Sequence, residues 1–343
     1  MSHSRRRPVV DAIQLRLSLC LIGAVAVTVA LSAAVAVQSR SRAVRVARAR
    51  SAMGTLLEID AFGADGASTE AAVAAAFRAV DEVERRLSNW RADSELSAAN
   101  TSRRFPLSAA TWRSLSAALS LARETDGAFD PTVGAITEPL GLTGHAPDPE
   151  RARPEAVGWW KARLEPESRT LLFATPGVLI DSGGFGKGEA LDRALAELRR
   201  RRVVAARLNF GGQVSLLGTA TSSGRRADLD DVSVAEPRSG SSRELCRFSP
   251  GDRSVSTSGV SERPGHILDP RTGRAARFAG SVTVVADTGI RADALSTALF
   301  VLGPKEGVSF ADRRGIAALF VVPCGFGWEL RPSREFPRTR RVS

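Results

Sequence analysis

The longest apolar stretch of the chain is at residues 17–37, which contain no charged side chain and follow three arginines at 5–7. At about 1.5 Å per residue, a helix of this length crosses a bilayer core of roughly 30 Å. Because the positive charges precede it, we expect residues 1–16 to stay in the cytoplasm and the rest to be exported. The stretch fits an uncleaved anchor by its length and a cleaved signal peptide by the A-x-A pattern at 34–36.

After residue 50, apolar residues three or four positions apart predict amphipathic helices. In the first of them, Val73, Phe77 and Val80 lie on one face. In the second, Ser108 is a typical N-terminal cap and Gly127 a typical terminator. The helices are expected at 68–88, 108–125, 187–203 and 291–302.

Short apolar runs bounded by glycine and polar residues predict strands. They are expected at 55–62, 171–173, 177–181, 206–210, 214–217, 281–286 and 317–322. Helices and strands are mixed without a regular alternation, which indicates an α+β fold in a single unit over 51–328.

Three polar segments complete this organisation. Residues 38–50 are basic and are expected to form a linker next to the membrane. Residues 220–245 are rich in glycine and serine and are expected to form a surface loop. Residues 329–343, rich in arginine and proline, are expected to be a disordered tail.

The charge of the chain is concentrated at its ends. The formal net charge is +11, of which residues 1–50 contribute +8 and residues 329–343 contribute +3. The part between them is neutral, whereas nucleic-acid binding needs positive charge on the folded surface. We therefore expect no nucleic acid among the partners.

Cysteine and histidine are scarce. Cys20, Cys246 and Cys324 include no C-x-x-C pair, and the 343 residues contain three histidines. These are too few cysteines for a disulfide framework, and the spacing argues against a Cys/His zinc site. The 43% hydrophobic and 25% charged residues are typical of a globular protein.

Glycine-rich segments carry the candidate chemistry. Paired glycines let backbone N–H groups approach a ligand closely, which favours phosphate binding, although each segment alone also fits an ordinary tight turn. The segment 181–188 leads into a predicted helix and contains Lys187, one of three lysines in the chain. It has neither P-loop nor Rossmann spacing. The segments lie at 125–132, 181–188, 209–213, 256–259 and 266–273.

Asp293 and Thr297 are four residues apart on a predicted helix and share one face. A carboxylate and a hydroxyl suit a cation that prefers oxygen ligands, such as Mg²⁺, and they also fit a helix charge beside a packed threonine. His266 precedes an Asp-Pro turn. It fits a general base and equally a turn residue bonded to the backbone.

In their order along the chain, these segments resemble the FAD:protein FMN transferase family, also called ApbE. The resemblance covers residues 53–303, and it rests on the ordered set rather than on any one motif. The matching segments are Met53-Gly54-Thr55, Leu87-Ser88-Asn89-Trp90, Ser94-Glu95-Leu96-Ser97 with Asn100, TDGAFDPTVG from 125, DSGGFGKGEALD from 181, NFGGQV from 209, SVSTSG from 254, HILDPRTG from 266, SVTVVA from 281 and ADALSTALFVLG from 292.

The resemblance implies an α+β catalytic unit that binds FAD in a cleft with Mg²⁺. It also implies transfer of FMN to a Thr or Ser hydroxyl of an acceptor protein, with release of AMP. His266 matches the histidine that activates this hydroxyl. The flavin contacts would be Met53, Trp90, Ala128, Phe129, Asp130, Asp181, Lys187 and Ile267. The metal site would comprise Asp293 and Thr297 with backbone oxygens near Gly184 and Ser296.

Four departures from the family pattern bear on activity. Family members usually have aspartate where Gln213 stands, an apolar residue where Ser182 stands and an aromatic residue where Glu189 stands. Val260-Ser261 replaces a usual Asp-Tyr pair, and the chain has no tyrosine. These departures put the metal affinity, the transfer rate and the cofactor affinity in question.

The expected function is therefore that of an exported or membrane-anchored flavin transferase. Two alternatives remain at this stage: a protein that binds FAD without transfer, and an FAD pyrophosphatase that yields FMN and AMP. An acceptor motif of the D-x-x-[ST]-G-A-[ST] type is absent from this chain, and its nearest approach is Thr257-Ser258-Gly259-Val260. The acceptor is therefore expected to be another protein.

Overall fold

A computed structural model describes residues 43–144, 146–218, 231–260 and 265–342. The helices are α2 (Gly66–Leu87), α3 (Glu95–Asn100), α4 (Ala109–Glu124), α5 (Gly134–Thr137), α6 (Gly186–Arg200) and α8 (Gly289–Arg314), with short 3-10 helices η1 (Pro149–Arg151), η2 (Pro154–Ala156) and η3 (Trp159–Lys161). The strands are β1 (Val44–Ala52), β2 (Thr55–Gly63), β3 (Arg104–Pro106), β4 (Ala162–Glu165), β5 (Thr170–Phe173), β6 (Ala205–Phe210), β7 (Gln213–Leu217), β8 (Val232–Ala235), β9 (Glu244–Phe248), β10 (Ser254–Gly259), β11 (Leu268–Asp269), β12 (Arg274–Ala275), β13 (Ser281–Ala286), β14 (Ala317–Cys324), β15 (Gly327–Pro332) and β16 (Arg340–Arg341).

The main sheet has eight strands in the order β1-β2-β6-β7-β10-β13-β14-β15, and every neighbouring pair is antiparallel. Two-residue turns join β1 to β2 and β6 to β7. At the first turn Met53 and Gly54 have φ of 43° and 76°, the left-handed conformation that suits such hairpins. Residues from both ends of the described chain thus belong to one sheet.

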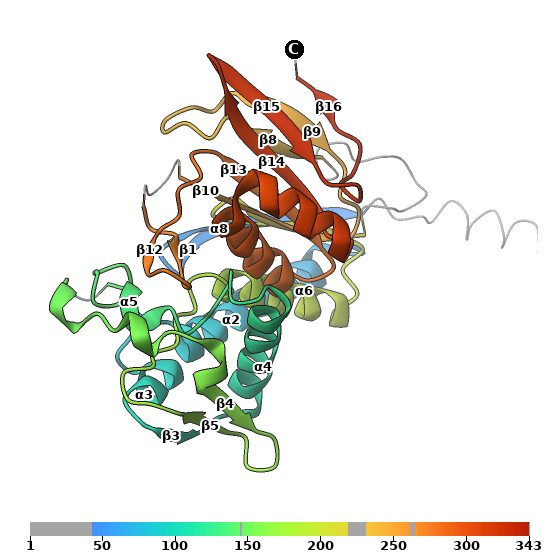
Figure 1. Cartoon of the computed structure of the whole chain (residues 1–343). Helices are drawn as coiled ribbons and strands as arrows, with labels where there is room; N and C mark the ends of the chain where they lie inside the picture. Colours follow the sequence, from blue (N-terminus) through green and yellow to red (C-terminus); the bar gives the residue numbers. More distant parts are fainter. Residues whose placement is uncertain (1–42, 145, 219–230, 261–264, 343) are drawn as a thin grey trace, which may run out of the picture. The chain divides into compact units, whose positions relative to one another are not determined.

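Both faces of this sheet are covered along part of its width. In β14, Ala318 and Phe320 belong to the larger core with the helices, whereas Leu319 and Val321 belong to a second core. This alternation follows from the two-residue period of a strand. The second core is closed by the three-stranded sheet β16-β9-β8, and Figure 1 shows these strands on the opposite side of the main sheet from α2, α4 and α6.

The α+β fold is confirmed, and the elements expected at 55–62, 68–88, 108–125 and 187–203 correspond to β2, α2, α4 and α6. Ser108 does cap α4, since its hydroxyl accepts a hydrogen bond from Thr111 N at 3.2 Å. The segment 177–181 is not a regular strand; it is joined to Val133 through Leu179 by one parallel bridge.

Residues 44–50 were expected to belong to a linker, and this expectation is wrong because they form most of β1. The arginines that suggest a linker pair with carboxylates elsewhere in the fold. Arg45 contacts Asp60 of β2, and Arg48 contacts Glu70 of α2 at 2.6 Å. Such partners, 15 and 22 residues away in the sequence, cannot be found by reading the segment alone.

The expectation of a disordered tail at 329–343 is also wrong, because β15 extends into this segment and β16 lies within it. Ser333 anchors the tail: its hydroxyl donates to Ile316 O at 2.7 Å and accepts from Ala318 N at 2.9 Å. Likewise, the loop expected at 220–245 contains β8 and the start of β9, and the loop-like segment expected at 256–259 lies within β10. The helix expected at 291–302 extends to Arg314 through a kink at Gly303.

The predicted membrane segment at 17–37 lies outside the described residues. Among the helices that the structure does describe, none combines the length and the hydrophobicity needed to cross a bilayer.

Candidate functional site

The loop 181–188 is held in place by asparagines from a distant part of the chain. Asn89 donates to Ile180 O at 2.7 Å and accepts from Ser182 N at 2.9 Å. Asn100 makes a similar pair of bonds with the backbone of Ile180, both at 2.9 Å. These two asparagines form part of the motifs at 87–100, and their role in fixing the loop is visible only in the tertiary structure.

Within the loop, Asp181 uses both carboxylate oxygens. Its Oδ1 accepts from Gly183 N at 2.7 Å, and its Oδ2 accepts from the Thr137 hydroxyl at 2.6 Å. The loop then enters α6 at Gly186. Ser182 is buried, and its hydroxyl donates to Leu87 O at the end of α2, at 2.6 Å. The polar side chain that replaces the family's usual apolar residue therefore has a hydrogen-bond partner.

The first turns of α6 and α8 touch at two glycines, Gly188 and Gly289. A Cβ atom on either would overlap the backbone carbonyl of the other, so only glycine permits this approach. Each helix start is also capped by an aspartate of the other helix. Asp293 Oδ2 accepts from Gly188 N at 3.1 Å, while Asp192 accepts from Gly289 N at 2.6 Å and Ile290 N at 3.0 Å.

Asp293 is buried at this junction, and burial raises the pKa of its carboxyl group. The positive charge of Lys187 is the strongest opposing influence on that pKa, followed by the hydrogen bonds from Gly188 N and Ser256. The charge of Lys187, in the glycine-rich loop 181–188, therefore acts on Asp293.

Thr297 and Ser296 lie in the turn of α8 that follows Asp293, and both hydroxyls donate to Asp293 O, at 3.2 Å and 2.9 Å. Thr297 faces loop 181–188, because its Oγ1 is 3.4 Å from the position that a Cβ on Gly184 would occupy. The structure thus brings together the four residues that the resemblance assigns to a metal site.

These donors fit a hard divalent cation such as Mg²⁺, which accepts carboxylate, hydroxyl and carbonyl oxygens and keeps several waters. The buried Oε1 of Gln213 is a further oxygen at the α6–α8 junction. It has no hydrogen-bond partner among the residues that the structure describes, while its Nε2 donates to Gly289 O at 3.1 Å. No group of three His, Cys, Asp or Glu side chains suited to a metal occurs in the part of the chain that the structure describes. A site here would therefore rely on one carboxylate.

Two predicted flavin contacts lie against the same loop. The Met53 side chain packs on the start of α6, with its Cε 3.3 Å from the position of a Cβ on Gly186. The Phe129 ring lies beside Gly184 and meets Phe185 edge to face, with ring centroids 6.5 Å apart. These two apolar side chains therefore cover the glycine-rich backbone at Gly184 and Gly186.

Two other predicted flavin contacts, Ala128 and Asp130, are buried inside the protein. Ala128 is fully buried. Asp130 accepts from Thr132 N and Thr132 Oγ1 through Oδ1, and from Trp159 N through Oδ2, at 2.6–2.8 Å. Burial raises the pKa of Asp130. Its carboxylate is therefore committed to shaping the segments at 130–132 and 158–159.

The remaining predicted site residues lie on separate loops. Trp90 is 62% exposed, and its ring lies against the backbone of Gly144. His266 and Ile267 are half-buried and immediately precede β11. Ile267 O accepts from Ala276 N at 2.9 Å, which closes the β11–β12 hairpin.

Comparison with known proteins identifies the family of this chain. The model of the ApbE family matches residues 53–320. The chain belongs to the ApbE family. Among the family's solved structures, the flavin transferase ApbE from Vibrio cholerae superposes with a TM-score of 0.76 at 28% identity, covering 86% of this chain and 98% of that one. The ApbE protein from Thermotoga maritima gives a TM-score of 0.72 at 26% identity, covering 86% and 100%.

Two curated relatives in the ApbE family carry the name FAD:protein FMN transferase. The protein from Rhodobacter capsulatus is 31% identical over 285 residues, which cover 78% of this chain. Those residues cover 53% of the relative, so this chain spans about half of that protein's length. The protein from Klebsiella pneumoniae is 28% identical over 310 residues, covering 83% of this chain and 86% of the relative.

Asp192, for which the sequence offers no motif, provides a test of the α6–α8 junction. Burial raises its pKa to about 6, so the folded protein binds a proton there more tightly than the unfolded chain. Its contribution to stability is therefore largest at acid pH and is lost as the pH rises toward 6. Between pH 4.5 and 7, we expect wild type to lose about 2 kcal/mol of unfolding free energy relative to Asp192→Asn. Urea unfolding of both proteins across this range measures the difference, and identical pH slopes would contradict the assignment.

Proposed function

We propose that this chain is an FAD:protein FMN transferase that moves FMN from FAD to a threonine or serine hydroxyl of an acceptor protein and releases AMP. Family membership and the names of its relatives support the flavin chemistry. The observation that carries the proposal is the junction at which Asp293 and Thr297 face the loop with Lys187 and Gly184. Phosphoryl transfer needs positive charge and fixed donors next to the phosphates.

In the proposed reaction, the acceptor hydroxyl attacks the phosphorus of the FMN half of FAD. A P–O bond to the acceptor forms, the pyrophosphate P–O bond breaks, and the electron pair leaves with AMP. His266 takes the hydroxyl proton as a general base. The positive charge of Lys187 and the start of α6 hold the phosphates, and Met53 and Phe129 line the apolar side of the loop.

Mg²⁺ is the cofactor that we propose for this site, where it would neutralise the phosphate charge and favour departure of AMP. Asp293, Thr297 and backbone oxygens at Gly184 and Ser296 would hold it. Trp90, with its exposed ring, would stack on a ring of the substrate. Ala128, Asp130, Asp181 and Ile267 would contribute the backbone and shape of the flavin cleft.

We also propose that the catalytic unit acts outside the cytoplasm, held at the membrane or exported through residues 17–37. The uncharged run after three arginines supports this location. The acceptor would then be an exported or membrane protein with a D-x-x-[ST]-G-A-[ST] motif. Cell fractionation of the full chain tests the location, and recovery in the cytoplasmic fraction alone would contradict it.

The activity is tested with the full chain in detergent, incubated with FAD, Mg²⁺ and an acceptor that carries D-x-x-T-G-A-T. We expect intact-mass analysis to show one FMN added to the acceptor and an equal amount of AMP released. AMP release without labelling would instead indicate the pyrophosphatase. Bound FAD with neither product would indicate a flavin-binding protein.

A further inference from the structure

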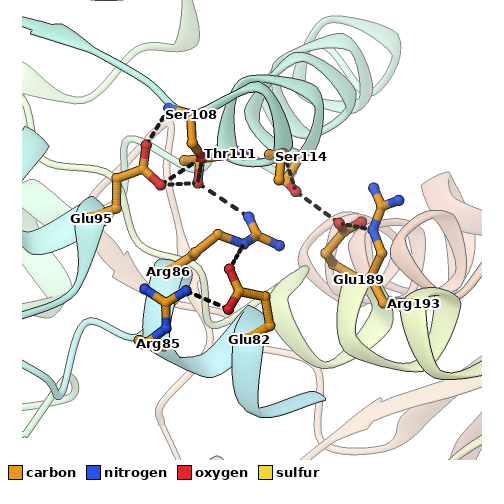
Figure 2. Close-up of polar contacts among 10 residues, drawn as sticks. Glu82, Arg85, Arg86, Glu95, Ser108, Thr111, Ser114, Glu189 and Arg193 are labelled. Carbon is orange, nitrogen blue, oxygen red and sulfur yellow. Dashed lines mark hydrogen bonds and ion pairs between the residues drawn. The ribbon is translucent and has the colours of Figure 1, made fainter. Parts of the chain in front are cut away.

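Glu189 stands where the family usually has an aromatic residue, yet it is only 4% exposed in the first turn of α6. Its Oε1 accepts hydrogen bonds from the Ser114 hydroxyl at 2.9 Å and from Arg193 Nε at 2.8 Å. Figure 2 shows the carboxylate directed toward α4, where Ser114 lies. The side chain therefore belongs to the packing between helices.

Arg86 of α2 is the buried cation of the same junction, also 4% exposed. Burial lowers the pKa of its guanidinium group, and Glu189 is the strongest of the negative charges that oppose this effect, ahead of Glu82 and Glu95. Arg86 Nη1 donates to Thr111 Oγ1 at 3.1 Å, and its Nε lies 3.6 Å from Glu82 Oε1. A buried arginine without its counter-charge is strongly unfavourable.

The polar cluster extends to a fourth helix. Glu95 of α3 accepts from the hydroxyls of Thr111 and Ser108 at 2.6 Å and 2.8 Å (Figure 2). Hydrogen bonds and charges therefore connect α2, α3, α4 and α6, and the groups at the centre of this network, Arg86, Thr111, Ser114 and Glu189, are buried. Such a network favours one relative position of the helices, because any shift leaves buried polar groups unpaired.

The position of α6 determines the geometry of the candidate site. Lys187 lies two residues before Glu189, and Gly188 between them donates its N–H to Asp293. A tilt of the first turn would move the backbone of 183–188 away from Thr297. Because hydrogen bonds need donor–acceptor distances of about 2.7–3.2 Å, a displacement of about 1 Å would break those to a bound phosphate and weaken FAD binding.

We propose that Glu189 is a positioning residue for FAD binding. Through its hydrogen bond to Ser114, and with its charge acting on the buried Arg86, it fixes the first turn of α6 and so holds Lys187 and the 183–188 backbone where the pyrophosphate of FAD binds. This inference rests on the proposed function, and it adds a residue that does not itself touch the substrate.

The test compares Glu189→Gln with a matched control on the same helix, Glu197→Gln. Glutamine keeps the size of the side chain and an oxygen for Ser114, but it removes a negative charge that acts on the buried Arg86. Glu197 is 28% exposed and pairs with Arg200 at 2.6 Å near the end of α6. For Glu189→Gln we expect about a tenfold higher Kd and KM for FAD, with kcat at saturating FAD within twofold of wild type. The control should bind FAD as wild type does.

Flavin fluorescence titration measures the Kd without acceptor, and labelling rates give kcat and KM. Equal FAD affinity in wild type and Glu189→Gln would overturn the inference, as would a fall in kcat with unchanged affinity. If Glu189→Gln does not fold, Ser114→Ala takes its place, with an expected increase of about threefold in Kd; unchanged affinity would overturn the inference. Absence of FAD binding in wild type itself would overturn the proposed function, which is a separate result.

Discussion

Asp293→Asn is expected to lower Mg²⁺-dependent FMN transfer about 10³-fold, equivalent to about 4 kcal/mol of transition-state stabilisation. The asparagine oxygen is neutral and binds a divalent cation weakly. FAD binding should weaken but persist, because Lys187 and the backbone of 183–188 are unchanged. Labelling of the acceptor over a range of Mg²⁺ concentrations measures the loss.

The same variant should be more stable than wild type when Mg²⁺ is absent. Burial raises the pKa of Asp293, so the ionised carboxylate is unfavourable in the folded protein at neutral pH. Asparagine removes this cost and keeps an oxygen for Gly188 N. Asp287→Asn, at an exposed position just before α8, is the matched control and should change neither property. Wild-type activity in Asp293→Asn would exclude the proposed metal site.

His266→Ala is expected to reduce kcat about 10²-fold while the Kd for FAD stays within twofold of wild type. The reason is that the imidazole would act on the acceptor hydroxyl, which is not part of FAD. Single-turnover labelling of the acceptor gives the rate, and fluorescence titration gives the affinity. Added imidazole should restore part of the rate by supplying the missing base.

The competing interpretation of His266 as a turn residue makes different predictions. Since His266 immediately precedes β11, a structural role would lower the melting temperature and the FAD affinity together. Imidazole in solution would then have no effect on the rate. Normal transfer in His266→Ala would remove this residue from the mechanism altogether.

The helices with clear ends were predictable from local sequence. For α4, Ser108 bonds to Thr111 N, and such a cap depends on residues three positions apart. The end of α8 was not predictable in this way, because Gly303 and Pro304 resemble a helix stop. The helix instead continues after the kink, with proline in the first turn of the next segment, where its missing N–H does no harm.

The glycine-rich loops and the pair Asp293 and Thr297 could be found in the sequence because their chemistry depends on short spacings. The residues that hold these groups in position could not be found in the sequence in this way. Asp192 caps a helix that starts 97 residues later, and Asn89 holds a backbone 91 residues away. Tertiary packing determines which residues they contact, and a single sequence carries no local signal of such distant contacts.

The first strand also has a consequence for where the chain can be shortened. The family match begins at Met53, but β1 ends just before it and pairs with β2 along its full length. Without β1, the backbone groups of β2 would become an open sheet edge available to other chains. The carboxylates of Asp60 and Glu70 would lose their arginine partners as well. A version that starts at the family boundary should therefore aggregate, while one that starts before Val44 should stay monodisperse.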